Sequence, residues 1–280
     1  MLMIIAVASG KGGTGKTSVA VNMAVSVGNV KLLDCDVEEP NAHLLLHPEI
    51  KRKEPVYTFI PKINKDLCNI CGECAKFCQF NAILAIAEEI LVFPELCHNC
   101  GGCSIVCPKK AITWAKHRIG TLHFGVAGSV SLVYGELKVS KPLAVPVIKA
   151  VKKHIKEAKD VIIDSPPGTS CPFVETVNDS NFCLLVTEPT PFGLHDLKIA
   201  VEVLRKLTVP FGVVVNRADI GEKKLYNYCR SENIRIMLEI PYQRRITELY
   251  SKGIPFSLEM TEWKEKFQTL YSEIRSLATK

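Results

Sequence analysis

The apolar residues of this chain recur in short runs that are separated by longer amphipathic segments. The first run, Met3–Ala8, leads into a glycine-rich turn, and Thr17–Val27 follows with helical spacing. Val30–Leu33 is a second short apolar run. Continuous apolar runs of this length are typical of strands buried on both faces of a parallel sheet. The first sixty residues are therefore predicted to alternate strand and helix.

This alternation stops over residues 61–112, where the sequence becomes rich in cysteine and repeats itself. Asp66-Leu67-Cys68 opens one half and Glu95-Leu96-Cys97 opens the other, which gives an internal repeat of about 29 residues. The segment is predicted to be an inserted domain. It divides the α/β domain into a first part, residues 1–60, and a second part, residues 113–280.

The α/β pattern resumes after the insertion. The predicted strands are Asp160–Asp164, Phe182–Thr187, Phe211–Asn216 and Arg235–Glu239, and the predicted helices are Val145–Ala158, Gly193–Leu207, Glu222–Glu232 and Thr261–Ala278. Strands that alternate with helices predict an α/β fold, with a mostly parallel, doubly wound sheet covered by helices on both faces.

Composition narrows the class of protein. The 280 residues are 47% hydrophobic and 23% charged, with a net charge of +6. The basic residues are scattered, which argues against a nucleic-acid groove, and no apolar stretch reaches the ~18 residues of a membrane span. The N-terminal apolar run lacks a basic flank and is predicted to be a strand, not a signal peptide. Twelve cysteines, many in Cys-x-x-Cys spacing, then indicate metal binding in a reducing cytoplasm.

A phosphate-binding loop follows the first predicted strand. It reads Gly10-Lys11-Gly12-Gly13-Thr14-Gly15-Lys16-Thr17, followed by Ser18. In Gly-x-x-x-x-Gly-Lys-Thr the glycines let backbone N–H groups face phosphate oxygens, the lysine reaches the terminal phosphates, and the threonine hydroxyl can bind Mg²⁺. The whole loop through Ser18 is therefore predicted to bind a nucleotide.

The additional lysine, Lys11, indicates which group of phosphate-loop proteins this loop resembles. The sequence resembles the deviant Walker A ATPases of the MinD, Mrp and nitrogenase-iron-protein group. In that group this lysine crosses a dimer interface to the partner's phosphates. The resemblance implies an ATPase with a low, partner-stimulated rate, working as a homodimer or as a heterodimer with a similar ATPase. A plain surface lysine is the alternative.

Three further segments match the same group. Asp34-x-Asp36-x-x-x-x-Asn41 resembles switch I, where Asp36 would orient the attacking water, and a structural role for Asp34 stays open. Asp164-x-Pro166-Pro167-Gly168 resembles the Walker B and switch II segment. The resemblance implies catalytic roles for Lys11, Lys16, Asp36 and Asp164, and Mg²⁺ held near Thr17, Asp36 and Asp164.

The residue predicted to recognise the nucleotide base lies at the end of a predicted strand. Asn216 matches the base-recognising asparagine of the group, and Arg217 follows it. The stretch Asn216-Arg217-Ala218-Asp219 also resembles the guanine-reading Asn-Lys-x-Asp of GTPases. Lys11 favours ATP with Mg²⁺ over GTP.

The insertion carries two runs of four cysteines. Three thiolates at i, i+3 and i+6 with a remote fourth suit a cubane cluster, and the segment resembles bacterial dicluster ferredoxins. In those proteins the fourth ligand comes from the other run. The resemblance implies two 4Fe-4S clusters in a small α+β ferredoxin-like domain, one held by Cys68, Cys71, Cys74 and Cys107, the other by Cys78, Cys97, Cys100 and Cys103. Zinc is the alternative metal.

The remaining four cysteines are interpreted as small apolar residues: Cys35, Cys171, Cys183 and Cys229. Cys171 has a second interpretation. It lies seven residues after Asp164, where the nitrogenase iron protein places a ligand of its subunit-bridging cluster.

Three functions follow from this combination. The insertion leaves the sheet just after switch I, at the edge where nucleotides bind, so ATP is predicted to gate electron transfer from the clusters to a redox acceptor. The alternative is an assembly ATPase that delivers clusters to an apo-metalloprotein. A MinD-like positioning role would need a membrane-binding tail, but the apolar stripe of Thr261–Ala278 is predicted to pack on the sheet.

Overall fold

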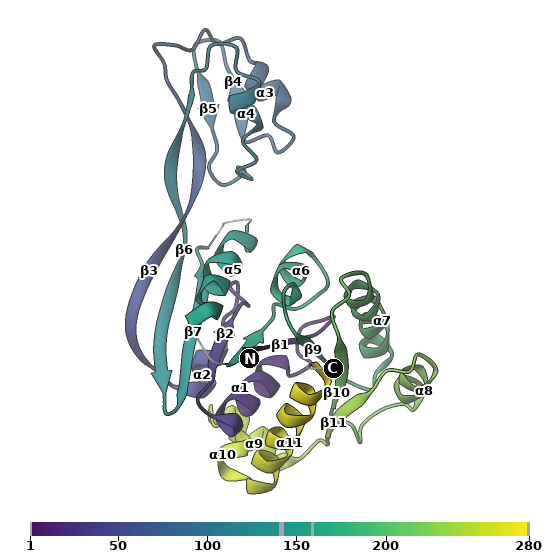
Figure 1. Cartoon of the computed structure of the whole chain (residues 1–280). Coiled ribbons are helices and arrows are strands. Elements are labelled where there is room, and N and C mark those ends of the chain that lie inside the picture. The colour runs from purple at the N-terminus through teal and green to yellow at the C-terminus, as the bar shows by residue number, and fades with distance from the viewer. Residues whose placement is uncertain (1, 140–142, 158–159, 279–280) are drawn as a thin grey trace.

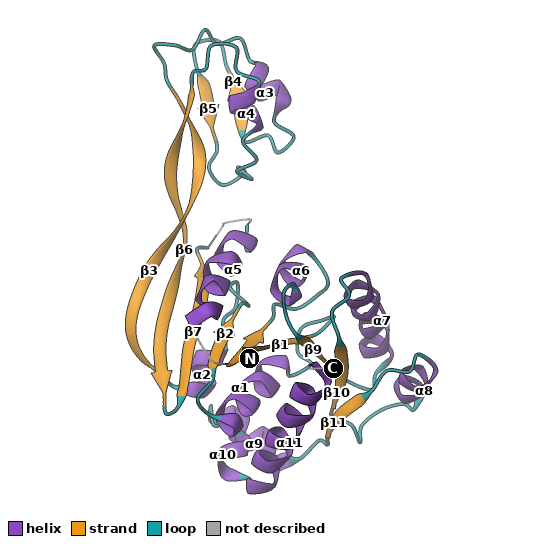
Figure 2. Cartoon of the chain, in the orientation of Figure 1, coloured by secondary structure: helices purple, strands orange, loops and turns teal. Residues whose placement is uncertain are grey.

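The computed structural model describes residues 2–139, 143–157 and 160–278. Within these ranges, nine strands form one sheet in the order β11-β10-β9-β1-β8-β2-β7-β6-β3 (Figures 1 and 2). The neighbours from β11 to β7 are all parallel, and β6 is antiparallel to β7 and β3. The predicted α/β fold with a mostly parallel sheet is confirmed.

The buried strands lie where the apolar runs predicted them. Four have the predicted bounds: β1 Met3–Ala8, β8 Asp160–Asp164, β9 Phe182–Thr187 and β10 Phe211–Asn216. Two are displaced by one residue: β2 Lys31–Asp34 and β11 Ile236–Ile240.

Helices cover both faces of this sheet. One face packs against α1 Lys16–Val27, α2 Ala42–Leu46, α9 Arg244–Ser251, α10 Phe256–Glu259 and α11 Thr261–Ala278. The other packs against α5 Val145–Lys152, α6 Cys171–Val177, α7 Pro191–Lys206 and α8 Lys224–Ser231. Helix α5 is shorter than predicted, because the chain tightens into a 3₁₀ turn over Lys153–Glu157, and Ala158 lies outside the described residues.

The apolar stripe of α11 is buried, as predicted. Trp263, Phe267 and Ile274 are fully buried in the core that α11 shares with α1. Packing on the sheet layer therefore accounts for this stripe. Among the helices of the described ranges, none is long and apolar enough to span a membrane.

A long antiparallel ribbon, which the sequence did not predict, carries the inserted segment. Strand β3, Glu49–Ile63, pairs with β6, Ile112–Ala127, which pairs in turn with β7, Val130–Leu137. Val56 lies opposite Gly120, which lies opposite Leu137 at the end of β7. The seven residues on each strand beyond this point, 57–63 and 112–118, therefore project past the carboxyl edge of the sheet by about 23 Å.

The cysteine-rich residues 64–111, here called the cysteine module, lie at the far end of this ribbon (Figure 1). They form two short helices, α3 Glu73–Phe77 and α4 Gly102–Ile105, and a hairpin of β4 Ile83–Ala85 with β5 Ile90–Val92. The predicted boundaries at 60–61 and 112–113 thus fall within or at the end of the ribbon strands. The module is on the nucleotide side of the sheet, but the ribbon separates it from the switches.

Three stacked rings connect the start of the ribbon to the main sheet and its helices. Tyr134 of β7 stacks on His43 of α2, with ring centroids 4.8 Å apart, and on His123 of β6, at 4.4 Å. The His123 ring nitrogen Nε2 lies 3.0 Å from the Glu136 carboxylate. Tyr134 therefore links α2, the helix after the switch I segment, to β6, the strand that returns from the cysteine module.

Replacing Tyr134 with Ala is expected to lower the free energy of unfolding by about 3 kcal/mol, because it leaves a cavity between the His43 and His123 rings. Urea unfolding followed by circular dichroism measures this. Tyr250, 56% exposed, is the matched control, and Tyr250→Ala should change stability by less than about 0.5 kcal/mol. Equal midpoints for the two variants would contradict the anchoring role.

Candidate functional site: a nucleotide cavity and two cysteine cavities

The phosphate-binding loop joins β1 to α1 and forms one wall of a cavity of about 410 Å³. Gly15 has a φ of 91°, and a Cβ there would lie 2.5 Å from the Asn216 side-chain nitrogen. Only glycine fits this close approach. The loop residues that line the cavity are Gly13, Gly15, Lys16, Thr17 and Ser18.

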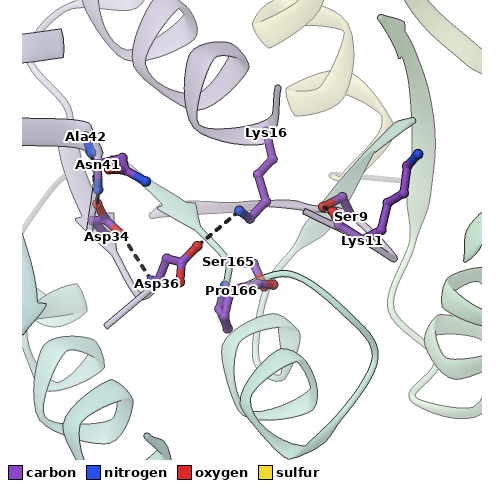
Figure 3. A network of polar contacts seen from close by, with 9 residues as sticks. All are labelled: Ser9, Lys11, Lys16, Asp34, Asp36, Asn41, Ala42, Ser165 and Pro166. Carbon is purple, nitrogen blue, oxygen red and sulfur yellow. Dashed lines mark hydrogen bonds and ion pairs between the residues drawn. The ribbon is translucent and has the colours of Figure 1, made fainter. Parts of the chain in front are cut away.

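Lys16 and Asp36 form a buried ion pair at the phosphate end of this cavity. The Lys16 ammonium lies 3.1 Å from the Asp36 carboxylate (Figure 3). Burial raises the pKa of Asp36, and the charge of Lys16 opposes this rise. The structure thus brings the predicted phosphate-binding lysine and the predicted water-orienting carboxylate together.

Asp34 is a structural residue of the switch I segment. Its buried carboxylate accepts hydrogen bonds from the backbone N–H groups of Asp36, Asn41 and Ala42, at 3.0, 3.1 and 3.0 Å. These bonds fold the chain between β2 and α2 and fix the direction of Asp36 (Figure 3). Of the two roles left open by the sequence, the structure favours the structural one.

Asp164, at the end of β8, has a fully buried carboxylate, and neither of its oxygens has a hydrogen-bond partner of normal geometry. Burial raises its pKa to about 7, while the nearby Lys16 charge and Thr17 hydroxyl lower it. A buried carboxylate without a partner is costly, and Mg²⁺ prefers oxygen ligands. Thr17 and Asp164 therefore fit a magnesium ion bound with a nucleotide.

The affinity for Mg²⁺ in the presence of ADP is expected to fall about tenfold per pH unit below pH 7 and to level off above it. The reason is that the ion must displace a proton from Asp164, whose pKa is about 7. The same raised pKa means that the metal-free protein loses stability as the pH rises through 7. Calorimetric Mg²⁺ titrations from pH 6 to 8 test this. ADP binding without Mg²⁺ is the control and should not show this slope.

Lys11 does not line its own nucleotide cavity. Its ammonium lies 3.9 Å from the Glu188 carboxylate, which also contacts the Arg217 guanidinium at 3.0 Å. In Figure 3 its side chain points away from Lys16. The two lysines of the loop therefore face different directions, and 31% of the Lys11 side chain remains exposed.

Asn216 and Arg217, the residues predicted to lie beside the nucleotide base, both line the cavity. Asn216 donates to the Thr14 carbonyl at 2.9 Å and accepts from the Arg217 backbone N–H at 3.0 Å, so its amide ties β10 to the phosphate loop. The Asp219 carboxylate accepts the Tyr242 backbone N–H at 2.6 Å. One oxygen of this carboxylate is therefore bound to the backbone of the loop after β11.

Several cavity residues were not predicted, because no motif marks them. The loop after β11 and helix α9 supply the wall opposite the phosphate loop, and its members are Pro241, Tyr242, Gln243, Ile246, Thr247 and Tyr250. The Asp219–Tyr242 bond holds this loop in place.

The eight cysteines of the module line two separate cavities. One is lined by Cys68, Cys71, Cys74 and Cys107, and the other by Cys78, Cys97, Cys100 and Cys103. These are the two sets that the ferredoxin resemblance implied, each with its fourth cysteine from the other run. Burial raises the pKa of Cys74, Cys97 and Cys103. Neighbouring cysteines of the same set raise the pKa of each of these thiols further.

The described residues hold no group of three or more His, Cys, Asp or Glu that fits a single metal ion. Zinc needs four ligands around one ion. A cubane binds each thiolate to a different iron atom, so its ligands surround a larger volume, and four thiolates are its usual donor set.

The other cysteines divide into two kinds. Cys35, Cys183 and Cys229 are buried, as expected of small apolar residues. Cys171 is exposed at the first residue of α6, so that interpretation is wrong for it.

A parallel sheet with a phosphate loop after its first strand defines a P-loop nucleotide-binding protein. Residues 5–256 match the CbiA family, the CobQ/CobB/MinD/ParA nucleotide binding domain, and the chain belongs to this family. The family and fold are those of nucleotide-hydrolysing ATPases.

Relatives cover most of the chain. The uncharacterized protein MJ0578 of Methanocaldococcus jannaschii is 32% identical, over 98% of this chain and 97% of its own length. The iron-sulfur cluster carrier protein of Pyrococcus abyssi is 26% identical, over 91% of this chain and 79% of its own. Among solved structures, the septum site-determining protein MinD of Pyrococcus horikoshii, complexed with Mg-ADP, shares the fold with a TM-score of 0.61 and 19% identity, covering 99% and 98% of the two chains.

Proposed function

We propose that this chain is an ATP-hydrolysing, dimeric iron–sulfur protein that delivers clusters from its cysteine module to apo-proteins. The observation that carries the cluster-binding part of the proposal is the pair of four-cysteine cavities on a ribbon that leaves the nucleotide edge of the sheet. Relatives named iron-sulfur cluster carrier protein, from Pyrococcus abyssi and Aquifex aeolicus, each match about 90% of the chain and support this direction.

The nucleotide residues have the following roles in this proposal. Lys16 binds the terminal phosphates, and Thr17 and Asp164 hold Mg²⁺. Asp36, once Lys16 engages phosphate, orients the attacking water. Lys11 leaves Glu188 to reach the phosphates bound by the partner protomer, so that ATP closes the dimer.

Gated electron transfer is the second candidate, and the ligand sets favour it. Four thiolates satisfy every iron of a cubane, and such clusters are held firmly. The chain would then keep both clusters, and ATP would change the position of the module relative to a redox acceptor. The two candidates share the ATPase cycle and differ in whether the cluster leaves.

One anaerobic experiment separates them. The chain is reconstituted with radioactive iron and mixed with an acidic bacterial-type apo-ferredoxin, with ATP and Mg²⁺ or without. ATP-stimulated appearance of label in the acceptor supports delivery. Retained label, together with ATP-dependent electron transfer from the dithionite-reduced chain to an oxidised holo-ferredoxin, supports electron transfer. If neither process depends on ATP, both candidates fail. The Lys16→Ala variant is the control for nucleotide dependence.

A further inference from the structure

The ribbon has one face that is not covered by the rest of the described chain. Tyr57 and Phe59 alternate along β3 and are 48% and 46% exposed. Thr58, between them, points to the opposite face and is only 5% exposed. Alternate residues of a strand point to opposite sides, so one side of the ribbon is covered and the other is open.

Cross-strand pairing places cations between these aromatic side chains. Tyr57 pairs with Arg118, and Phe59 pairs with Lys116. Pro61, which is buried, pairs with Trp114, which is 40% exposed. Directly paired residues share a face, so an apolar strip with two cations runs along the open side. We call its exposed members the ribbon face: Tyr57, Phe59, Trp114, Lys116 and Arg118.

The ribbon face continues into the second cysteine cavity. Pro61 and Trp114 line the cavity that also contains Cys78, Cys97, Cys100 and Cys103. Phe77 and Phe80 line the same cavity and are 47% and 41% exposed. A partner that lies on the ribbon face therefore also reaches the surface beside these thiols.

The cations of the ribbon face are not neutralised. Arg118 donates to the Thr121 hydroxyl at 2.8 Å and to the Gly120 carbonyl at 3.4 Å, and both acceptors are uncharged. In the described part of the chain, Lys116 has no ion pair. The face thus combines exposed aromatic groups with unpaired positive charge.

We propose that the ribbon face is the docking surface for an acidic protein partner, the one that receives what the cysteine module delivers. This inference rests on the proposed function for the partner's role. Aromatic side chains and arginine are enriched at the centre of protein interfaces, and opposite charges at the rim steer association.

Two other occupants fit the face less well. Phosphate contacts dominate nucleic-acid affinity, and the two cations of this face would neutralise only about two phosphates. A second copy pairing through the same face would bring Lys116 and Arg118 close to their own equivalents, and like charges repel. An acidic protein surface with an apolar centre complements both features.

The test uses the full-length, anaerobically reconstituted protein and a fluorescent, acidic bacterial-type apo-ferredoxin as the probe. Anisotropy gives the Kd at low and high salt. Tyr57→Ser with Phe59→Ser is expected to raise the Kd at least about tenfold. Lys116→Glu with Arg118→Glu should weaken binding similarly and remove most of its salt dependence. Leu258→Ser, at a residue 60% exposed on α10, and Lys264→Glu are the matched controls and should bind as wild type.

Unchanged iron content and ATPase rate show that the variants fold, since neither pair touches the nucleotide or cysteine cavities. Wild-type binding that survives both double variants overturns the proposal. So does absence of wild-type binding to the acidic probe, a preference for single-stranded DNA, or self-association that the double variants abolish. Loss of docking is measured without cluster transfer, so failure of the proposed function alone leaves the binding result intact.

Discussion

Lys16→Ala is expected to reduce ATP hydrolysis by at least about 10²-fold and to weaken nucleotide binding, because it removes the ammonium that neutralises charge on the transferred phosphate. The substitution also leaves the Asp36 carboxylate buried without its ion-pair partner, 3.1 Å away in the wild type. Steady-state phosphate release and ADP calorimetry measure the two effects. If the variant hydrolyses ATP at half the wild-type rate, Lys16 is not a catalytic residue.

Lys11→Ala should lose hydrolysis equally but keep ADP affinity, because Lys11 faces Glu188 and not its own cavity. Mixing the two variants then gives a direct test of a shared site. A dimer of one Lys11→Ala and one Lys16→Ala protomer has one complete site, with Lys16 from the first and Lys11 from the second. In an equimolar random mixture, half of the dimers contain one protomer of each variant. Each of these dimers has one active site of its two, so about a quarter of wild-type activity should return. No recovery would contradict the crossing role of Lys11.

The nucleotide half of the molecule was predictable because its signals are local. Each buried strand is a continuous apolar run with turn residues at its ends, and the phosphate loop is a contiguous motif. Asp34 shows the limit of such signals. Its sequence position allowed either a catalytic or a structural role, and only the three backbone hydrogen bonds to its carboxylate decide between them.

The ribbon was not predictable for physical reasons. Strand β3 is an edge strand with exposed residues on both sides at its start, Glu49–Lys53, so it lacks apolar alternation. Pro55 and Pro61 lie within it and are typical of loops in sequence, although proline is tolerated in an edge strand. Its pairing with β6 links residues more than forty positions apart, which no local pattern shows.

The assignment of cysteines to the two cavities also depends on residues that are far apart in sequence. The cysteine module places Cys107 beside the first three cysteines of the other run, and Cys78 beside Cys97, Cys100 and Cys103. A pattern of four cysteines in a row would, on spacing alone, also allow each run to hold its own cluster. The two arrangements predict different behaviour when two cysteines are replaced together.

Cys78→Ser is expected to remove one cluster and about half of the bound iron, because a cubane that loses one of its four thiolates is held poorly. Adding Cys97→Ser to it should cost no further iron, since both residues line the same cavity. Adding Cys68→Ser instead should remove nearly all of the iron, since Cys68 lines the other cavity. If each run held its own cluster, these two outcomes would be reversed.

Iron analysis and electron paramagnetic resonance of the reduced protein measure these outcomes. Cys229→Ser is the control, because Cys229 is a buried cysteine outside the module, and this variant should retain both clusters.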